Sequence, residues 1–254
     1  MMKNVTKQFK KEIQLFDTVE ERLKHLKDRY KGQTAYIVTC GPSLSKHDVA
    51  QLRSKLSDKL VICIKQAQNL LQNETDFHLM STYNLSPYEW NDDTIVFWQF
   101  SKSYVEGQLQ KVVNLQAPID LYIPVINPPF INRTQTTQAT ENFDNFYMME
   151  TDTEVMWGSG MMYETGIPLA LLLGCTKIVT IAWDLGHPNK PHKHFDDDKI
   201  KRDCYPMDGE IAETLKSTIA LEKWLDDKNI DFKILSDESY INQNFERITL
   251  ENID

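Results

Sequence analysis

A short turn with the residue types of a phosphate-binding site follows the first apolar run of the chain. The turn is Cys40-Gly41-Pro42-Ser43-Leu44, directly after residues 34–39. Gly41 would let backbone N–H groups approach a ligand, and the Ser43 hydroxyl would add a donor near a helix start, which favours an anionic group. The same residues also suit an ordinary Gly-Pro turn with a serine helix cap. The turn matches neither G-x-G-x-x-G nor a Walker loop, so it lacks the dinucleotide and P-loop fingerprints.

Four further polar clusters share this kind of position, because each stands where an expected strand ends or an expected helix begins. They are Lys65-Gln66, Tyr83-Asn84-Leu85-Ser86, Gly158-Ser159-Gly160, and Asp184 with the loop after it. In an open α/β sheet the ligand binds beyond the carboxyl ends of the strands. The shared position therefore predicts one site built from all five segments. For Gly158-Ser159-Gly160 a helix cap is the alternative, and the run is not the nucleophile elbow G-x-S-x-G.

Residues 185–208 gather groups that bind phosphate or carry protons. They include three of the six histidines of the chain, His187, His192 and His194. We expect this loop to bind a leaving phosphate or to supply a proton donor, and a solvated charged loop is the alternative. Residues 127–154 and 185–208 are both long for connections inside a compact domain, so we interpret them as lid-like loops over the site.

Metal binding depends on two features of the sequence. Asp196-Asp197-Asp198 offers hard carboxylate ligands for Mg²⁺ or Mn²⁺, although acidic residues in a charged loop are commonly just solvated. The nearby histidines lack a further His or Cys at structural-zinc spacing, and the four cysteines form no C-x-x-C pair. We therefore assign no metal ligand and no required cofactor, and we expect reduced, buried thiols.

Alternating strands and helices are expected to position these clusters. Short apolar or β-rich runs predict strands at 34–39, 60–64, 77–82, 94–100, 119–126, 177–183 and 232–235. Helical spacing predicts helices at 49–56, around 69–71, at 161–173 and at 210–225. Apolar strands that alternate with helices are typical of a parallel sheet covered on both faces. The sequence therefore predicts a Rossmann-like α/β domain over residues 33–254.

Two amphipathic helices are expected ahead of this domain, in residues 1–32. Phe9, Ile13 and Phe16 recur at helical spacing, and Thr18-Val19-Glu20-Glu21 has the pattern of a capping box that starts the second helix. We interpret these helices as an extension packed on the domain. An arm for oligomerisation or for a membrane surface is the alternative.

Composition limits the class of partner. The 254 residues carry a formal charge of −9 and are 41% hydrophobic, so the chain can form a sizeable core but lacks the basic balance of a nucleic-acid binder. The longest strongly apolar stretch, residues 167–174, is far shorter than the roughly 20 residues that cross a bilayer, and no secretory signal opens the chain. We expect a cytoplasmic protein, peripheral to a membrane only through partners or the basic residues 7–11; homo-oligomerisation stays open.

Taken in order, these segments resemble the family 42 bacterial sialyltransferases, which share a Rossmann-like core with the archaeal hydroxymethylpterin pyrophosphokinase-like proteins. The matching pieces are CGPSL at 40–44, Ile64-Lys65-Gln66, residues 83–86, Ser159-Gly160, the LGCTKI…D segment at 173–184, and the late helix at 218–225. The resemblance covers roughly residues 34–236 and leaves the N-terminal helices outside. The fold that the resemblance implies is a variant of the GT-A glycosyltransferase architecture.

The activity that the resemblance implies is an inverting, metal-independent transfer from a CMP-activated sugar to a glycan acceptor, with CMP-sialic acid or a related CMP-keto-sugar as donor. By similarity, the Cys40–Ser43 turn and Asn84 would hold the phosphate and the sugar of the donor. Ser159 and Gly160 would meet the cytidine, and Asp184 would stand near the ribose or the acceptor.

Lys65 departs from the family, which has an asparagine after the second strand. Its ammonium group, beside Gln66, could instead neutralise the phosphate of the donor directly. Cys40 likewise stands where the family usually has an asparagine before GPSL. Two tyrosines that steady the leaving phosphate in the family have no clear match after Asp184, where this chain has its histidine-rich loop.

The catalytic base is the largest departure. The family uses a histidine just before the late helix, where this chain has Ala212. We therefore expect Glu210, Glu213, His192 or His194 to deprotonate an acceptor hydroxyl or to contact the leaving phosphate. A carboxylate would suffice, because the anomeric carbon of the donor develops strong cationic character and a weak base is enough to assist attack on it. Glu210 and Glu213 are also ordinary first-turn helix residues favoured by the helix dipole.

Two other functions remain as alternatives to a glycosyltransferase of glycan biosynthesis. A pyrophosphokinase-like transferase on the same core would need ATP and Mg²⁺, and the Asp196-Asp197-Asp198 run favours it. A non-catalytic nucleotide-binding relative would keep the fold without the base, which agrees with Ala212. Dependence on Mg²⁺ and hydrolysis of the donor would separate the three.

Overall fold

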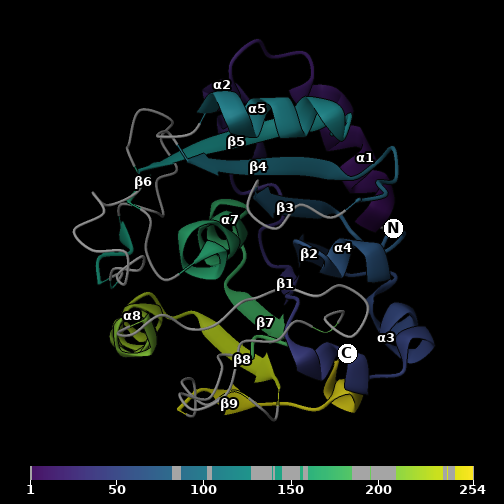
Figure 1. The fold of residues 1–254 in the computed structure, drawn as a ribbon. Helices are drawn as coiled ribbons and strands as arrows, with labels where there is room; N and C mark the ends of the chain where they lie inside the picture. Colours follow the sequence, from purple (N-terminus) through teal and green to yellow (C-terminus); the bar gives the residue numbers. More distant parts are fainter. Residues whose placement is uncertain are drawn as a thin grey trace.

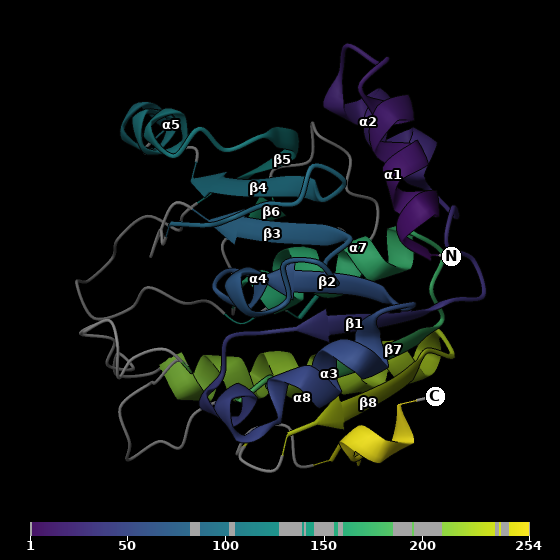
Figure 2. The ribbon, with the colours of Figure 1, turned by 90° about the vertical axis from the view of Figure 1, so that its right-hand side faces the viewer.

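One wholly parallel sheet forms the centre of the molecule. The computed structural model describes residues 2–81, 87–101, 105–126, 139, 141–144, 155–156, 160–184, 195, 210–236, 239 and 244–253. Nine strands lie within these ranges, and every paired strand runs parallel to its neighbour (Figures 1 and 2). They are β1 (Thr34–Val38), β2 (Leu60–Ile64), β3 (Phe77–Ser81), β4 (Ile95–Ser101), β5 (Ile119–Ile126), β6 (Val155–Met156), β7 (Lys177–Ile181), β8 (Asp231–Leu235) and β9 (Glu246–Arg247). This arrangement confirms the predicted Rossmann-like α/β class.

The strand order reverses once, beside β1. The order across the sheet is β6-β5-β4-β3-β2-β1-β7-β8-β9, so the chain runs outward from β1 to β6 and then returns to the other side of β1. Ligands of doubly wound sheets bind beyond the carboxyl ends of the strands at such a reversal. The carboxyl ends of β1 and β7 therefore mark the place where a site is expected.

Helices cover both faces of the sheet because alternate strand residues point to opposite sides. Val61 and Cys63 lie in one apolar cluster with α3 (Val49–Leu56) and α4 (Ala67–Leu70), whereas Leu60 and Ile62 lie in another with α7 (Ile167–Leu172) and α8 (Glu210–Asp227). Near β3 and β4 a third cluster includes α5 (Val105–Asn114). Both faces are thus buried, which explains the continuously apolar strands.

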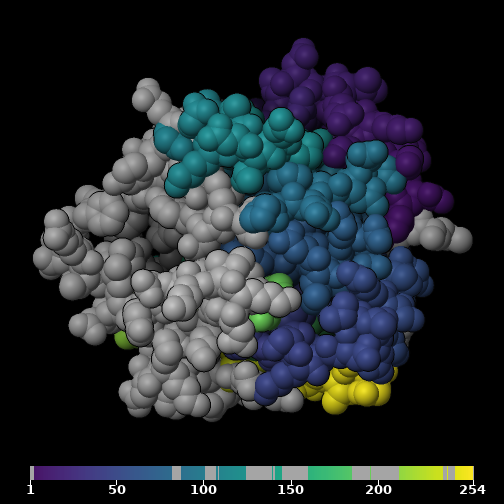
Figure 3. All heavy atoms as spheres, turned by 45° about the vertical axis from the view of Figure 1, so that its right-hand side comes forward, coloured from purple at the N-terminus to yellow at the C-terminus, as the bar shows by residue number. Residues whose placement is uncertain are grey.

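The N-terminal helices, α1 (Met2–Ile13) and α2 (Val19–Leu26), pack into the same core as the sheet. Thr18 and Glu21 form the predicted capping box at the start of α2. Phe9 and Ile13 are buried among strand residues, and the predicted packing on the domain is confirmed. In the space-filling view these helices cover the upper right of the molecule, beside α5 (Figure 3).

Three lysines of α1 hold the helix against acidic residues at the amino edge of the sheet. Lys3 lies 2.6 Å from Asp76, Lys7 lies 2.9 Å from Asp93, and Lys10 lies 3.2 Å from Asp120. The spacing of four and three residues puts these lysines on one helix face. Much of the basic character of residues 7–11 is therefore used in intramolecular ion pairs, which weakens the case for a membrane-surface arm.

Asp76 is the most deeply buried acid of this lysine–aspartate row. It also accepts hydrogen bonds from the Thr6 hydroxyl at 2.5 Å and from the Val61 N–H at 2.9 Å. Burial, the largest influence, raises the pKa of the Asp76 carboxyl, and the charge of Lys3 opposes that rise. One carboxylate thus joins α1, β2 and the start of β3.

Some elements were not predicted. These are α5, β6, β9, η1 (Pro42–Lys46) and η4 (Leu250–Asn252), and the expected helix at 161–173 begins as a π-helix, η3 (Met162–Gly166). Apart from residues 139, 141–144 and 195, the two lid-like loops lie outside the described residues. In the part of the chain that the structure describes, no helix has the length and apolarity to cross a membrane.

Candidate functional site

The strand reversal places the turn after β1 directly beside the turn after β7. Asp184 joins them: its Oδ2 accepts the Ser43 N–H at 2.6 Å, and its Oδ1 accepts the Ser43 hydroxyl at 2.8 Å. The Ser236 hydroxyl, just past β8, also donates to Oδ1. Both carboxylate oxygens of Asp184 therefore accept hydrogen bonds from within the protein. We interpret this residue, which was predicted to contact a ligand, as a structural residue that fixes the turns around the site.

Gly41 is required by the close approach of these two turns. A Cβ built on Gly41 would lie 2.5 Å from Oδ2 of Asp184 and closer still to the carbonyl oxygen of Ala182. The φ angle of Gly41 is −65°, which any residue adopts. Space, not backbone conformation, makes glycine necessary here.

The Gly41, Ser43 and Leu44 N–H groups of the turn donate to acceptors within the protein. Gly41 N–H donates to Ala182 O at 3.2 Å, Leu44 N–H donates to Gly41 O at 3.1 Å, and Ser43 N–H donates to Asp184. Pro42 has no N–H. Because these donors already have acceptors, the structure does not support the expectation that they approach a phosphate. The turn forms part of the carboxyl edge of the sheet. A group that binds a phosphate there must come from another segment.

Two residues at the carboxyl edge have a left-handed backbone without being glycine. Lys65, directly after β2, has φ of 51°, and Ala182, directly after β7, has φ of 57°. Such a conformation costs on the order of 1–3 kcal/mol, and residues that keep it gather at functional sites. Lys65 is half-buried and lies one strand away from Gly41, whereas its predicted partner Gln66 is fully buried.

The Lys65 turn rests on a buried histidine that sequence reasoning missed. His78 Nε2–H donates to the Lys65 carbonyl at 3.0 Å, and Trp90 Nε1–H donates to His78 Nδ1 at 2.8 Å. These two contacts define a neutral imidazole with its proton on Nε2. Burial, which outweighs the hydrogen bond to Lys65, lowers the pKa of His78 to about 3 from its ordinary value of 6.5.

The stability of the protein should therefore fall in acid partly through His78. Below pH 6.5 the unfolded chain gains a proton on this residue, and the folded chain does not until the pH nears 3. The contribution of neutral His78 to the free energy of unfolding is complete above pH 6.5. It is lost as the pH falls below that value, by on the order of 1 kcal/mol per pH unit. In urea unfolding at pH 7, 6 and 5, the stability difference between wild type and His78→Gln should shrink accordingly. A constant difference would contradict the prediction.

A buried polar network also lies near the carboxyl end of β4. Gln99 Nε2 donates to Glu164 Oε2, and its Oε1 accepts the Thr165 hydroxyl at 2.6 Å. Glu164 Oε1 accepts the N–H of Gly160, one of the predicted cytidine-binding residues, at 3.4 Å. Glu164 and Thr165 belong to the π-helix η3, and single π turns are frequent at functional sites.

Sequence reasoning missed Glu164, although a signal was present. It is the only acidic residue in the apolar run from Met161 to Leu173. Carboxylates are almost never fully buried unless they have partners. Glu164 is 1% exposed, so an acid in the middle of an apolar helix was the signal of a buried network. The π turn itself has no comparable sequence pattern.

Glu213 is the predicted base whose side chain the structure describes. Its carboxylate accepts the Ala139 N–H at 3.0 Å and pairs with Lys216 at 2.8 Å, and the hydrogen bond from Lys216 is the largest influence that lowers the pKa of Glu213. Glu213 thus joins α8 to Ala139, which lies within the loop expected at 127–154. Ala212 beside it is exposed.

The remaining predicted residues lie outside the described part of the chain. They are Asn84, Ser159, His192, His194 and the side chain of Glu210. The Asp196-Asp197-Asp198 run lies outside it as well. Among the residues that the structure does describe, no group of three or more His, Cys, Asp and Glu side chains is placed to hold a metal ion.

Two of the buried thiols in the described region are held in the protonated, weakly nucleophilic form. Burial raises the pKa of Cys63 to about 12 and that of Cys175 to about 12. Cys40 is also buried, and its carbonyl accepts the Phe195 N–H at 3.0 Å. A role for Cys40 in donor binding would therefore depend on its backbone.

Comparisons with known proteins add nothing to this geometry. No profile of a known protein family matches the chain. A search of curated proteins also found no significant match.

Proposed function

We propose that this protein transfers a sialic acid or a related keto-sugar from a CMP-activated donor to a glycan acceptor, with inversion and without a metal ion. The observation that carries the proposal is the reversal of strand order between β1 and β7, with the Gly41 turn and the left-handed Lys65 on the same edge. Nucleotides bind at such reversals. The ordered resemblance of residues 34–236 to the sialyltransferases supports a CMP-sugar as the nucleotide ligand.

The donor phosphate is assigned to Lys65. The Gly41, Ser43 and Leu44 N–H groups have acceptors inside the protein, whereas the Lys65 ammonium can form a charge-assisted hydrogen bond with a phosphate oxygen. The cytidine is assigned to Ser159 and Gly160, and Glu164 accepts the N–H of Gly160. Asn84 completes the proposed donor site by resemblance.

In the proposed reaction, an acceptor hydroxyl oxygen attacks the anomeric carbon on the face opposite CMP. The new C–O bond forms as the bond between that carbon and the phosphate oxygen breaks, and CMP leaves with the electron pair. The acceptor proton passes to a base, for which Glu213 is the described candidate. The pairing with Lys216 lowers the pKa of Glu213 and makes it a weak base, which a strongly cationic donor carbon tolerates.

A screen of melting temperature against CMP, CDP, UDP, GDP and ATP, each with and without Mg²⁺, tests the proposal. CMP at a 100-fold excess over its Kd should stabilise the native state by about 2.7 kcal/mol, a shift of roughly 5–10 °C, without need of Mg²⁺. A shift with ATP that requires Mg²⁺ would support the pyrophosphokinase-like alternative. No shift with any nucleotide would contradict nucleotide binding.

The assignment of Lys65 is tested in the same screen. Lys65→Ala should reduce the shift with CMP by at least half, because it removes the proposed cation at the phosphate. Lys111→Ala, on the exposed face of α5, is the matched control and should keep the full shift. Equal shifts in both variants would remove Lys65 from the proposed site.

A further inference from the structure

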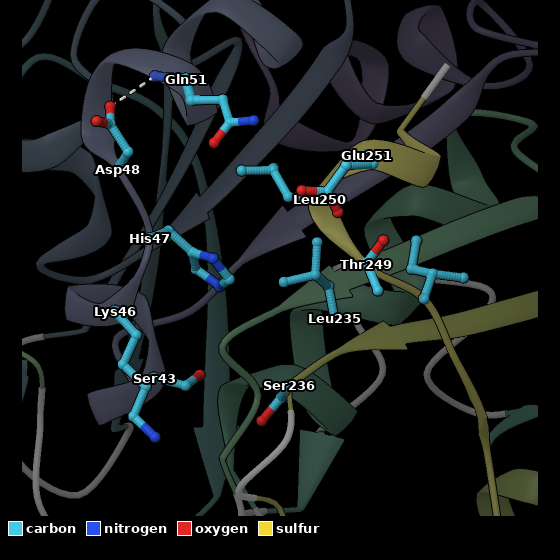
Figure 4. Close-up of a pocket in the computed structure, with 11 residues that line it drawn as sticks. Ser43, Lys46, His47, Asp48, Gln51, Leu235, Ser236, Thr249, Leu250 and Glu251 are labelled. Carbon is cyan, nitrogen blue, oxygen red and sulfur yellow. Dashed lines mark hydrogen bonds between the residues drawn. The ribbon is translucent and has the colours of Figure 1, made fainter.

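A cavity of about 250 Å³ opens beside the Gly41–Ser43 turn. Figure 4 shows η1 and the start of α3 on one side, the end of β8 below, and η4 on the other side. Ser43 and Ser236 line this cavity, and both donate to Asp184. The cavity therefore lies against the Asp184 contacts that join the turns after β1, β7 and β8.

The walls of the cavity are held by contacts of the C-terminal residues. Lys55 Nζ donates to the carbonyls of Glu251 and Ile253 at 3.2 and 2.8 Å. Leu250 and Ile253 are buried in the cluster that includes Leu52 and Leu56 of α3. In the space-filling view the C-terminal turn lies against the residues of α3 (Figure 3). The cavity is thus formed before any ligand binds.

The lining combines an apolar floor with neutral polar and charged side chains. Leu235, Ile248 and Leu250 supply aliphatic surface, and His47 and Gln51 supply polar groups. The charged residues of the lining are Lys46 and two carboxylates, those of Asp48 and Glu251. This balance of charge disfavours a strongly anionic ligand such as a phosphate.

One buried nitrogen of the lining needs a partner. Among the residues that the structure describes, Nε2 of His47 is buried and makes no hydrogen bond. The His47 ring extends toward Leu235 and Leu250 in Figure 4. Buried polar atoms are nearly always paired, and an unpaired one costs roughly 1–3 kcal/mol. Because Nε2 is shielded from solvent as the ring stands, a ligand hydroxyl would supply the missing partner once the His47 ring turns toward the cavity.

We infer that this cavity binds one neutral hexose or N-acetylhexosamine ring. The C–H face of the ring would lie on the aliphatic floor, and a ring hydroxyl would pair with His47 Nε2. The volume lies below the roughly 300–1,000 Å³ of pockets for drug-sized ligands, so it suits a single ring. Identification of the cavity as the acceptor subsite rests on the proposed function, but binding of the sugar does not.

Saturation-transfer NMR with methyl glycosides of glucose, galactose, N-acetylglucosamine and N-acetylgalactosamine tests the inference on the full chain. At least one glycoside should receive saturation from the wild-type protein, and His47→Phe should abolish that signal. Because His47→Phe can also disturb folding, Gln51→Leu serves as a second variant and should reduce the signal at least threefold. Gln110→Leu, an exposed glutamine on α5 far from the cavity in sequence, is the matched control and should leave it unchanged.

The outcomes separate this inference from the proposed function. Absence of saturation for every glycoside, equal signals in Gln51→Leu and Gln110→Leu, or saturation of cytidine at this cavity in place of a glycoside would each overturn it. A glycoside signal that depends on His47 and Gln51 would support it even if CMP failed to shift the melting temperature. That combination would reject the CMP-sugar transferase and keep a sugar site.

Discussion

Gly41→Ala is expected to lower the free energy of unfolding by about 3 kcal/mol or more and to abolish the melting shift with CMP. The added methyl group would overlap the Ala182 carbonyl and Oδ2 of Asp184, and neither is the free end of a flexible side chain. Overpacking of this kind commonly costs 1–3 kcal/mol, and the loss of the Asp184 hydrogen bonds adds to it. Urea unfolding and the CMP screen measure the two effects.

The control for this substitution is Gly107→Ala. Gly107 lies in α5, and a Cβ there would have no heavy atom within 4 Å. Alanine is favoured over glycine inside a helix by roughly 0.5–1 kcal/mol, so this variant should be slightly more stable than wild type. If Gly41→Ala were as stable as Gly107→Ala, the turns after β1 and β7 could not be packed as described.

Asp76→Ala is expected to destabilise the protein by about 3–5 kcal/mol, because it removes a fully buried carboxylate that accepts hydrogen bonds from α1 and β2 and pairs with the partly exposed Lys3. The Val61 N–H would lose its acceptor. Among the described residues, Lys3 would keep only the carbonyls of Lys59 and Glu74, and the Thr6 hydroxyl would keep only the Tyr30 hydroxyl. The substitution should detach α1 from the amino edge of the sheet. Urea unfolding measures the loss, and amide hydrogen exchange should show faster exchange throughout α1.

Asp93→Ala is the matched control, because it breaks the neighbouring lysine–aspartate pair of α1. Its pair with Lys7 is largely exposed, with 48% and 34% of the two side chains accessible. Exposed pairs contribute about 0–1 kcal/mol and are screened by salt. A loss of stability in Asp93→Ala equal to that in Asp76→Ala would show that burial does not set the strength of these contacts.

The strands and the N-terminal helices were predictable because their signals are local. The continuous apolar run at residues 60–64 reflects burial on both sides of the sheet, as do the buried residues 178–181. Thr18 and Glu21 mark the start of α2 in the sequence because their side chains form its capping box. The helix at 105–114 was missed because exposed Leu109 and Val113 and the glycine at 107 blur its pattern.

The sequence predicted where the candidate site lies in the fold but not which hydrogen bonds its residues make. The position of Gly41 and Asp184 after strands located the edge, since parallel strands share a carboxyl edge. The acceptors of the Gly41 and Ser43 N–H groups depend on residues about 140 positions away, and no local pattern encodes such a contact. The π turn that buries Glu164 depends in the same way on Gln99 of another strand.

The central position of β1 has a consequence for the order in which the protein forms during synthesis. β1 pairs with β2 early, but its other side is completed only by β7, and Ser43 lies 141 residues before its partner Asp184. At about 5–20 residues per second, ribosomes need roughly 7–30 s to make that interval. During this time one hydrogen-bonding edge of β1 stays open to other chains. The nascent protein should therefore be most prone to aggregation before residue 181 emerges, and the candidate site should be among the last parts to close.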